Sequence, residues 1–244
     1  TYSCMSCCAE GLGLVVAGQE DGALTAWRTD DVSDTPLVQG KVCEGEVKAL
    51  CVVECASGKA VLTANAGTVY VTPVTSGVDS TAVLLQVSGE VTSLAFGFPY
   101  QETSTLYLGM RTGQVLMYTV GFDLSSAELV ARYPFESEAG EGTESAISEL
   151  KLHRPRGSGD DLVYASSGSA VLTLQGSSLT LLSTLSHQSR ITALVIDAAG
   201  RFAAVGGEDG SITVWLLSTS EKLKAFQSRG SIAGACVCRG VLWV

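Results

Sequence analysis

Residues 185–227 read LSHQSRITALVIDAAGRFAAVGGEDGSITVWLLSTSEKLKAFQ, and this stretch decides the expected fold. Short β-strands are predicted where apolar residues alternate with small or polar ones, namely 191–195, 202–206, 211–217 and 223–226. Turn signals separate these runs, including Glu208-Asp209-Gly210. The stretch therefore predicts four antiparallel strands. Because one such sheet cannot bury both of its faces alone, copies of it must stack on each other.

Copies of this pattern recur along the chain. Residues 13–27 read GLVVAGQEDGALTAW and match residues 201–215 almost position for position. Three weaker copies lie between the two, at intervals of about 45 residues. The expected turn glycines are Gly22, Gly67, Gly113, Gly168 and Gly210, which are spaced by 45, 46, 55 and 42 residues. A regular interval of this length is typical of a repeat protein.

We therefore expect one all-β domain over residues 1–244. Its four-stranded antiparallel units are expected at approximately 1–41, 42–87, 88–135, 145–185 and 186–228, with part of a sixth at 229–244. The longest interval is explained by residues 136–144, ESEAGEGTE, which we expect to form a solvated or disordered loop; a dedicated acidic ligand arm is the alternative. Residues 123–130 could form a capped helix, but the repeat favours an outer strand there.

Composition limits the classes of function. Hydrophobic residues make up 46% of the chain and charged residues only 16%, below the roughly 25% of ordinary soluble domains. This low charge, with a mean hydropathy of +0.30, fits either a surface covered by a partner or a β-rich fold with small turn residues. The net charge of −10 argues against direct nucleic-acid binding. No apolar run is long enough for a membrane span.

The first residues suggest a chain that continues beyond the printed sequence. Thr1 is not an initiator Met, so we expect a piece of a longer or processed chain. The residues that follow have no basic region of the kind that opens a signal peptide.

Eight cysteines are present: Cys4, Cys7, Cys8, Cys43, Cys51, Cys55, Cys236 and Cys238. The Cys4-x-x-Cys7 spacing is compatible with zinc or redox chemistry, but no second such pair occurs, and His153 and His187 lie far away in sequence. Aligning the units places Cys51 and Cys236 at the strand position of Val195. We therefore expect buried free thiols, with disulfides and metal ligands as alternatives. Buried thiols imply a reducing intracellular compartment, cytoplasmic or nuclear.

The pattern Asp-Gly-x-x-x-x-Trp, preceded by His-x-x-x-Ile, resembles the WD-repeat family of β-propellers. The resemblance covers nearly the whole chain by its period, while the motif residues occur in the first and fifth units. It implies a β-propeller with five complete four-stranded blades and part of a sixth in this chain, and six or seven blades in the full chain. It also implies structural roles for His187, Asp209 and Trp215 in the fifth unit and for Asp21 and Trp27 in the first.

The chain departs from the family pattern at several positions. Val205 occupies the place of a Ser or Thr, so we expect an incomplete hydrogen-bond network in the fifth unit. Leu216 and Arg28 replace the Asp that follows the Trp, and the first unit's His would precede Thr1. The Trp position of the middle units holds Thr72, Tyr118 and Thr173. These departures predict that strand packing contributes more to stability than polar contacts do.

No catalytic, phosphate-binding or metal-binding spacing is recognisable, so we expect no catalytic residue and no cofactor. Partner binding is instead expected at one rim, where the candidates are Arg111, Arg190, Glu208, Glu20, Glu46 and Glu90; ordinary solvated turn residues are the alternative. The basic stretch Lys151–Arg156 is expected to be a solvated turn, or else a docking point for an acidic peptide or a phosphate.

The sequence thus predicts a non-enzymatic protein–protein interaction scaffold, a WD-repeat-like subunit of a larger hetero-oligomeric intracellular assembly. Its partners would be other protein subunits or peptides. The alternative is a hydrolase-like propeller enzyme with an active site in the central channel. Innermost strand positions that are mostly Val, Leu, Ala and Thr argue against that alternative.

Overall fold

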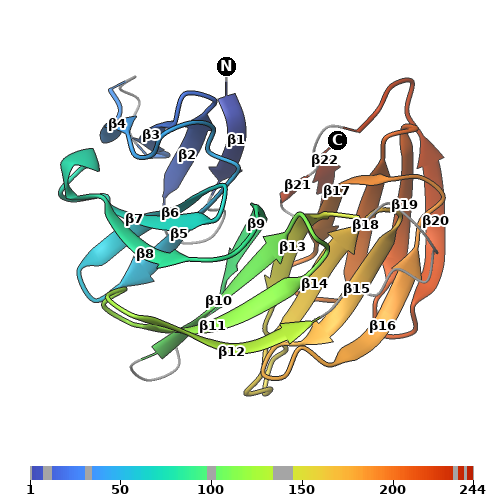
Figure 1. The fold of residues 1–244 in the computed structure, drawn as a ribbon. Coiled ribbons are helices and arrows are strands. Elements are labelled where there is room, and N and C mark those ends of the chain that lie inside the picture. The colour runs from blue at the N-terminus through green and yellow to red at the C-terminus, as the bar shows by residue number, and fades with distance from the viewer. Residues whose placement is uncertain are drawn as a thin grey trace. The chain divides into compact units, whose positions relative to one another are not determined.

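The computed structural model describes residues 2–7, 13–30, 35–97, 103–133, 145–232, 236–238 and 241–243. Their strands form five four-stranded antiparallel sheets and one two-stranded ribbon (Figure 1). Neighbours within each sheet follow one another along the chain. The described residues contain no helix with the length and hydrophobicity needed to cross a membrane.

The strands of each sheet are as follows. The first sheet contains β1 (Tyr2–Cys7), β2 (Leu14–Gln19), β3 (Ala23–Arg28) and β4 (Val38–Lys41). The second contains β5 (Ala49–Cys55), β6 (Gly58–Asn65), β7 (Thr68–Pro73) and β8 (Ala82–Gln86), with a short 3-10 helix, η1 (Val78–Ser80), before β8. The third contains β9 (Val91–Phe96), β10 (Thr103–Met110), β11 (Val115–Gly121) and β12 (Ala127–Tyr133).

The fourth sheet contains β13 (Ile147–His153), β14 (Leu162–Ser167), β15 (Ala170–Gln175) and β16 (Leu181–Ser186). The fifth contains β17 (Ile191–Ile196), β18 (Phe202–Gly207), β19 (Ser211–Leu216) and β20 (Glu221–Gln227). The ribbon pairs β21 (Cys236–Cys238) with β22 (Val241–Trp243).

The all-β prediction of five antiparallel four-stranded sheets in sequence order is confirmed. The outer strand favoured over a helix near residues 123–130 is also confirmed, although β12 begins only at Ala127. The acidic segment 136–144 lies outside the described residues.

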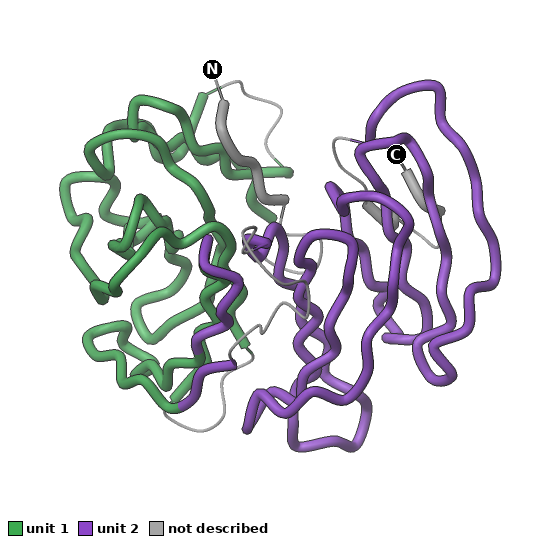
Figure 2. Tube along the Cα trace, turned by 45° about the vertical axis from the view of Figure 1, so that its right-hand side comes forward, with its two compact units in different colours: residues 1–110, 117–130 green, residues 111–116, 131–244 purple. Residues whose placement is uncertain are grey.

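The chain divides into two compact units, shown in different colours in Figure 2. One comprises residues 1–110 and 117–130, and the other comprises residues 111–116 and 131–244. The core of the first unit includes Leu14, Leu24 and Val61, and that of the second includes Tyr164, Ile191 and Val205. The single domain expected over residues 1–244, with its unit boundaries, stays a prediction.

Burial differs strongly between the strands of one sheet. The second strand β18 is buried along nearly its whole length, whereas all seven residues of the fourth strand β20 are exposed. Large apolar side chains that remain exposed lie on a fourth strand or next to one: Leu37, Val83, Leu129, Val130, Leu181, Leu182, Leu223 and Phe226. Because both faces of a second strand are covered, successive residues can all be apolar or small. This explains why the second strands are continuous apolar runs in the sequence.

One backbone hydrogen bond recurs between consecutive sheets. The amide of the apolar residue at or just before a first strand donates to a carbonyl at the turn that joins strands two and three of the preceding sheet. The four bonds are Val47 N to Gln19 O (3.0 Å), Val91 N to Ala66 O (2.7 Å), Ile191 N to Gly168 O (2.7 Å) and Ile232 N to Gly207 O (3.2 Å). The first, second and third sheets are therefore joined in the same way, as are the fourth and fifth sheets and the segment that follows the fifth.

The turn glycines allow this close approach. A Cβ added to Gly22, Gly67 or Gly210 would overlap backbone carbonyl oxygens of the segment that leads to the next sheet. Gly22 and Gly210 also have φ values of 86° and 80°, which favour glycine, whereas Gly67 is required by the approach alone.

The thiol prediction can be compared with three cysteines whose side chains are described. None of Cys43, Cys51 and Cys55 forms a disulfide, and Cys43 and Cys55 are buried while Cys51 is half-buried. Burial raises the pKa of the Cys43 thiol, which donates to Gly45 O at 3.5 Å. The side chains of the other five cysteines lie outside the described part, so their state stays a prediction.

Candidate functional site

A series of hydrogen bonds between polar side chains, most of them buried, crosses the fifth sheet. His187 precedes β17, and its backbone amide donates to Ser169 O at 2.7 Å. Its ring reaches two hydroxyls of β19, with Nε2 2.8 Å from Ser211 Oγ and Nδ1 3.0 Å from Thr213 Oγ1. All three side chains are buried. Because Ser211 and Thr213 are two residues apart on one strand, they face the same side and contact one ring.

Asp209 and Trp215 are the terminal members of this series of hydrogen bonds. The Asp209 carboxylate accepts from Ser211 Oγ (2.5 Å) and Ser211 N (3.0 Å). It also accepts from Ser189 Oγ (2.7 Å) and Gln188 Nε2 (3.3 Å), in the segment that leads into β17. At the other end, Trp215 Nε1 donates to Thr213 Oγ1 at 3.0 Å. The structure therefore brings His187, Asp209 and Trp215 together through two hydroxyls.

The expectation that Val205 leaves this network incomplete is wrong. The hydroxyls come from β19 instead of β18, since Ser211 and Thr213 lie on the same strand face as Trp215. That i, i+2, i+4 spacing of Ser, Thr and Trp was the sequence signal that could have identified them.

The proton positions follow from the partners. The Ser211 hydroxyl donates to Asp209, so it accepts from Nε2–H of His187. In the neutral ring Nδ1 then accepts from the Thr213 hydroxyl, whose oxygen accepts from Trp215. Burial lowers the pKa of His187, and Lys222 lowers it further, while Asp209 opposes both. His187 is therefore a neutral, doubly hydrogen-bonded ring, with no lone pair available for proton transfer.

The carboxylate at the turn is held in its charged form. Hydrogen bonds from Ser189, then Ser211 and Gln188, keep the pKa of Asp209 far below its usual range. The result is a fixed negative charge that fastens the 187–189 segment to the β18–β19 turn.

The first unit repeats the motif with fewer described contacts. Asp21 Oδ1 accepts from the Ala23 amide at 3.0 Å, which is the same turn bond that Asp209 makes with Ser211. Thr25, which corresponds to Thr213, accepts from Gln19 Nε2 at 3.5 Å. Trp27 is half-buried.

The predicted rim residues lie at the end of each sheet that carries the turn between strands two and three, here called the motif end. Glu20, Arg111, Arg190 and Glu208 are exposed there. Arg190 and Glu208 are neighbours, because the Glu208 amide donates to Arg190 O at 2.9 Å. Glu46 and Glu90 are half-buried and both pair with Lys48, Glu90 at 3.8 Å. These two carboxylates are therefore engaged with a cation of the same chain.

Asn65 is a fastening residue that the sequence did not reveal. Its Nδ2 donates to Glu44 O and Glu46 O, both at 2.8 Å, and so holds the segment that leads into β5. An Asn in a turn is common, and only the path of the segment that enters its own sheet gives Asn65 this role.

The basic stretch Lys151–Arg156 is largely engaged with nearby carboxylates. Arg154 binds Asp161 through two hydrogen bonds, of 2.7 and 3.2 Å. Lys151 lies 3.6 Å from Glu149, whose carboxylate accepts the Leu194 amide of the fifth sheet. Burial raises the pKa of Glu149 against the opposing effects of Lys151 and Leu194. The solvated-turn interpretation is wrong for Lys151 to His153, which belong to β13, and both Lys151 and Arg154 are ion-paired.

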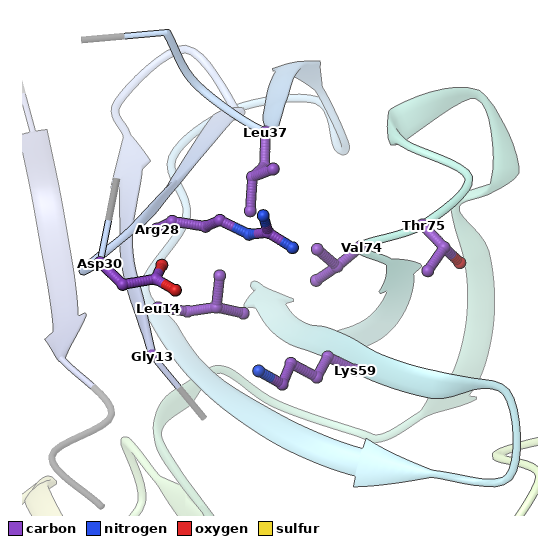
Figure 3. A pocket seen from close by; sticks show the side chains of 8 residues that line it. All are labelled: Gly13, Leu14, Arg28, Asp30, Leu37, Lys59, Val74 and Thr75. Carbon is purple, nitrogen blue, oxygen red and sulfur yellow. The ribbon is translucent and has the colours of Figure 1, made fainter. Parts of the chain in front are cut away.

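Two cavities lie at the opposite end of the sheets, which carries the turns between strands one and two and between strands three and four. One, of about 330 Å³, lies between the first and second sheets and includes Arg28, Asp30 and Lys59 (Figure 3). The other, of about 430 Å³, lies between the fourth and fifth sheets and includes Tyr164, Leu182 and Arg201. The sequence did not predict either cavity, because each is lined by residues of two different sheets.

Metal and cofactor chemistry receives no support from side-chain clustering. Within the described ranges, no group of three or more His, Cys, Asp and Glu side chains could hold a metal ion. The expectation of no cofactor, and that of no catalytic residue, stay predictions.

Comparison with known proteins supports the fold alone. No protein-family model and no curated protein matches the chain. Among solved structures, it is similar to the crystal structure of the computationally designed Ika8 protein, crystal packing No.1 in P63, with a TM-score of 0.69 and 19% identity. The match covers 99% of this chain and 67% of that chain.

Proposed function

We propose that the five sheets are blades of a WD-repeat-like β-propeller, with six or seven blades in the full chain. The recurring bond supports this proposal, because the same junction links sheets one to three and sheets four and five, as expected for stacked copies of one repeat. The Asp209–Ser211–His187–Thr213–Trp215 chain supports it as well.

On this fold we propose a non-enzymatic protein–protein interaction scaffold, a subunit of an intracellular hetero-oligomeric assembly. The observation that carries the proposal is the fixed backbone under Arg190 and Glu208. Residues 187–189 are held by Ser211, Thr213 and Asp209, and Arg190 O accepts the Glu208 amide. A backbone that is already fixed loses little conformational entropy on binding, so only the exposed side chains need to be ordered. Arg is also enriched among residues that dominate interface energies.

Site-specific photocrosslinking tests this proposal. A photoreactive amino acid replaces Arg190 in one variant and Lys224, exposed on the outer strand β20, in a control. In extract from the source cells, we expect a discrete crosslinked protein from position 190 and none from position 224. Adding Glu208→Lys should reduce that product at least several-fold, because it reverses the neighbouring charge. Equal crosslinking from both positions, or none from position 190, would contradict the proposal.

A further inference from the structure

The cavity between the fourth and fifth sheets is lined on one side by hydroxyl side chains from three adjacent strands. Tyr164 of β14 lies opposite Thr173 of β15, and Thr173 lies opposite Ser183 of β16. Residues that are directly opposite on antiparallel strands have their side chains on the same face. The other side of the cavity is formed by the turns after β17 and β19, and the second of these turns adds the hydroxyls of Ser218 and Ser220.

Two of these hydroxyls are buried and have no partner within the chain. Tyr164 is 1% exposed and Thr173 is 7% exposed, and neither hydroxyl makes a hydrogen bond with another described residue. In the described ranges, the side-chain oxygens that are fully enclosed without a hydrogen bond are those of Thr63 and Ser104. The hydroxyls of Tyr164 and Thr173 therefore open into the cavity. A ligand that offers an acceptor there would satisfy groups that are costly to leave unpaired.

The Tyr164 hydroxyl is a donor that favours an uncharged acceptor. Burial, and to a smaller extent the charge of Asp197, raise the pKa of Tyr164 to about 12, so the phenol keeps its proton. The Asp197 carboxylate is held in place, because it accepts the amides of Arg201 and Phe202, each at 2.6 Å. Its fixed negative charge opposes a second anion beside the same hydroxyl. A carbonyl oxygen meets both conditions.

The charged side chain that lines the cavity does not reverse this preference. Arg201 is exposed, and its guanidinium lies 5.4 Å from the centre of the Phe202 ring. A solvent-exposed charge contributes little to an ion pair. Arg201 also shares its turn with Asp197, so the two formal charges of that turn cancel. The cavity therefore matches an uncharged ligand.

Leucine side chains form the apolar part of the lining, namely Leu162, Leu182, Leu216 and Leu217. Leu162 and Leu217 pack against the core shared by the fourth and fifth sheets. Leu182, by contrast, is 53% exposed. An aliphatic group placed against these side chains would remove Leu182 from water, which is favourable.

Backbone hydrogen bonds hold the fifth-sheet side of the cavity in place. The Leu217 amide donates to Arg201 O at 2.9 Å, and the Gly200 amide donates to Asp197 O at 2.8 Å. The two turns are therefore joined to each other before any ligand arrives, which lowers the entropic cost of binding.

The volume of the cavity, about 430 Å³, lies within the range of small-ligand sites and accommodates one side chain with its neighbouring peptide groups. We propose that this cavity binds an uncharged peptide segment of a partner protein. An aliphatic side chain of that segment would lie on the leucines, and a backbone carbonyl oxygen would accept from Tyr164. This inference rests on the proposed scaffold function, because it assigns a partner class to a second surface, at the end of the sheets opposite Glu208.

NMR titration of the isotope-labelled protein with small peptide analogues tests the site. The probes are N-acetyl-leucine N-methylamide, the corresponding glycine compound, and N-acetyl-leucine, which carries a carboxylate. We expect the leucine amide to shift the methyl signals of Thr173, Leu182 and Leu217, with a dissociation constant in the millimolar range. It should bind at least about five-fold more tightly than the glycine compound, which lacks the aliphatic side chain. N-acetyl-leucine should bind more weakly than the leucine amide, because of the charge of Asp197.

Matched variants separate binding from folding. Tyr164→Phe should weaken the leucine amide about five- to ten-fold, while the free energy of unfolding of the unliganded protein stays equal or rises, since the lost hydroxyl has no partner there. Leu182→Ser should weaken binding several-fold. Leu181→Ser should leave it unchanged, because Leu181 is 42% exposed but does not line the cavity.

Four results would overturn the inference: equal affinity for the leucine and glycine compounds, tighter binding of N-acetyl-leucine, parental affinity in Tyr164→Phe, or equal losses from the two leucine substitutions. Since purified protein and synthetic compounds are used, these results are independent of crosslinking at Arg190.

Discussion

The second and fifth sheets fasten the segment that enters them by opposite chemistry at the same place. In the fifth sheet, the carboxylate of Asp209 accepts hydrogen bonds from the side chains of Gln188 and Ser189. In the second sheet, the amide of Asn65 donates to the backbone carbonyls of Glu44 and Glu46. The junction thus requires a polar side chain at the turn, and either an acceptor or a donor can satisfy it.

The two sheets also differ beneath this fastening. His187 and Cys43 both lie four residues before the apolar residue whose amide bonds the preceding sheet, Ile191 and Val47 respectively. His187 contacts two buried hydroxyls, whereas the Cys43 thiol makes weak contacts with backbone carbonyls. A thiol is a poor hydrogen-bond donor, so apolar packing contributes more to the second sheet.

The largest expected effect is shared by both sheets. Gly67→Ala should destabilise the protein by about 2 kcal/mol, because the added methyl overlaps two backbone carbonyl oxygens. Gly210→Ala should cost about 1 kcal/mol more, since its left-handed backbone adds strain. Urea unfolding measures both changes. Gly159→Ala is the control, because its Cβ would contact nothing. Equal stability of all three variants would disprove the role of close approach.

The next effect separates the two sheets. His187→Ala should cost about 2–3 kcal/mol, because it opens a buried space and leaves the Ser211 hydroxyl without its donor and the Thr213 hydroxyl without its acceptor. Asn65→Ala should cost about 1 kcal/mol, since the freed carbonyls lie near solvent. Urea unfolding of both variants gives the ratio. A larger loss for Asn65→Ala would reverse the ranking of the two fastenings.

The pH dependence should also belong to the fifth sheet. The folded-state pKa of His187 is lower than in the unfolded chain, so the unfolded state binds more protons as pH falls below about 6.5. Stability should therefore decrease from pH 7 to pH 5, and His187→Asn should flatten that slope. Thermal unfolding across this range is the measurement. An unchanged slope in the variant would show that His187 is not the group responsible.

The smallest expected effect lies at the junction of the fourth and fifth sheets. Glu149→Gln keeps an acceptor for the Leu194 amide and removes a half-buried charge. The raised pKa of Glu149 means that its stabilising contribution is lost as pH rises through that pKa. At pH 7 the free energy of unfolding of the variant should therefore equal that of the parent or be higher by less than about 1 kcal/mol. This difference should shrink at pH 4. A clear loss at pH 7 would indicate that the Lys151 ion pair dominates.

The repeat was predictable because its signals are local. Alternating apolar residues and glycines such as Gly67 and Gly210 locate strands and turns within one unit. His187, Asp209 and Trp215 were also found, since they keep a fixed spacing. The roles of Ser211 and Thr213 were not predicted, because the family pattern places the hydroxyl on the second strand, at the position of Val205. The contacts of Asn65 depend on how the segment that enters β5 lies against its own sheet, and the Arg28–Lys59 cavity depends on how one sheet meets the next; no motif spacing encodes either contact.

The exposed fourth strands have a consequence for handling this protein at high concentration. Lys222 and Lys224 give β20 two positive charges, whereas β16, Leu181–Ser186, contains no charged residue and exposes Leu181 and Leu182. Charged side chains on an outer strand discourage a second molecule from adding its own strand there. Irreversible self-association on storage is therefore expected to start along β16, and a single lysine in place of Leu182 would be the first change to make in a formulation study.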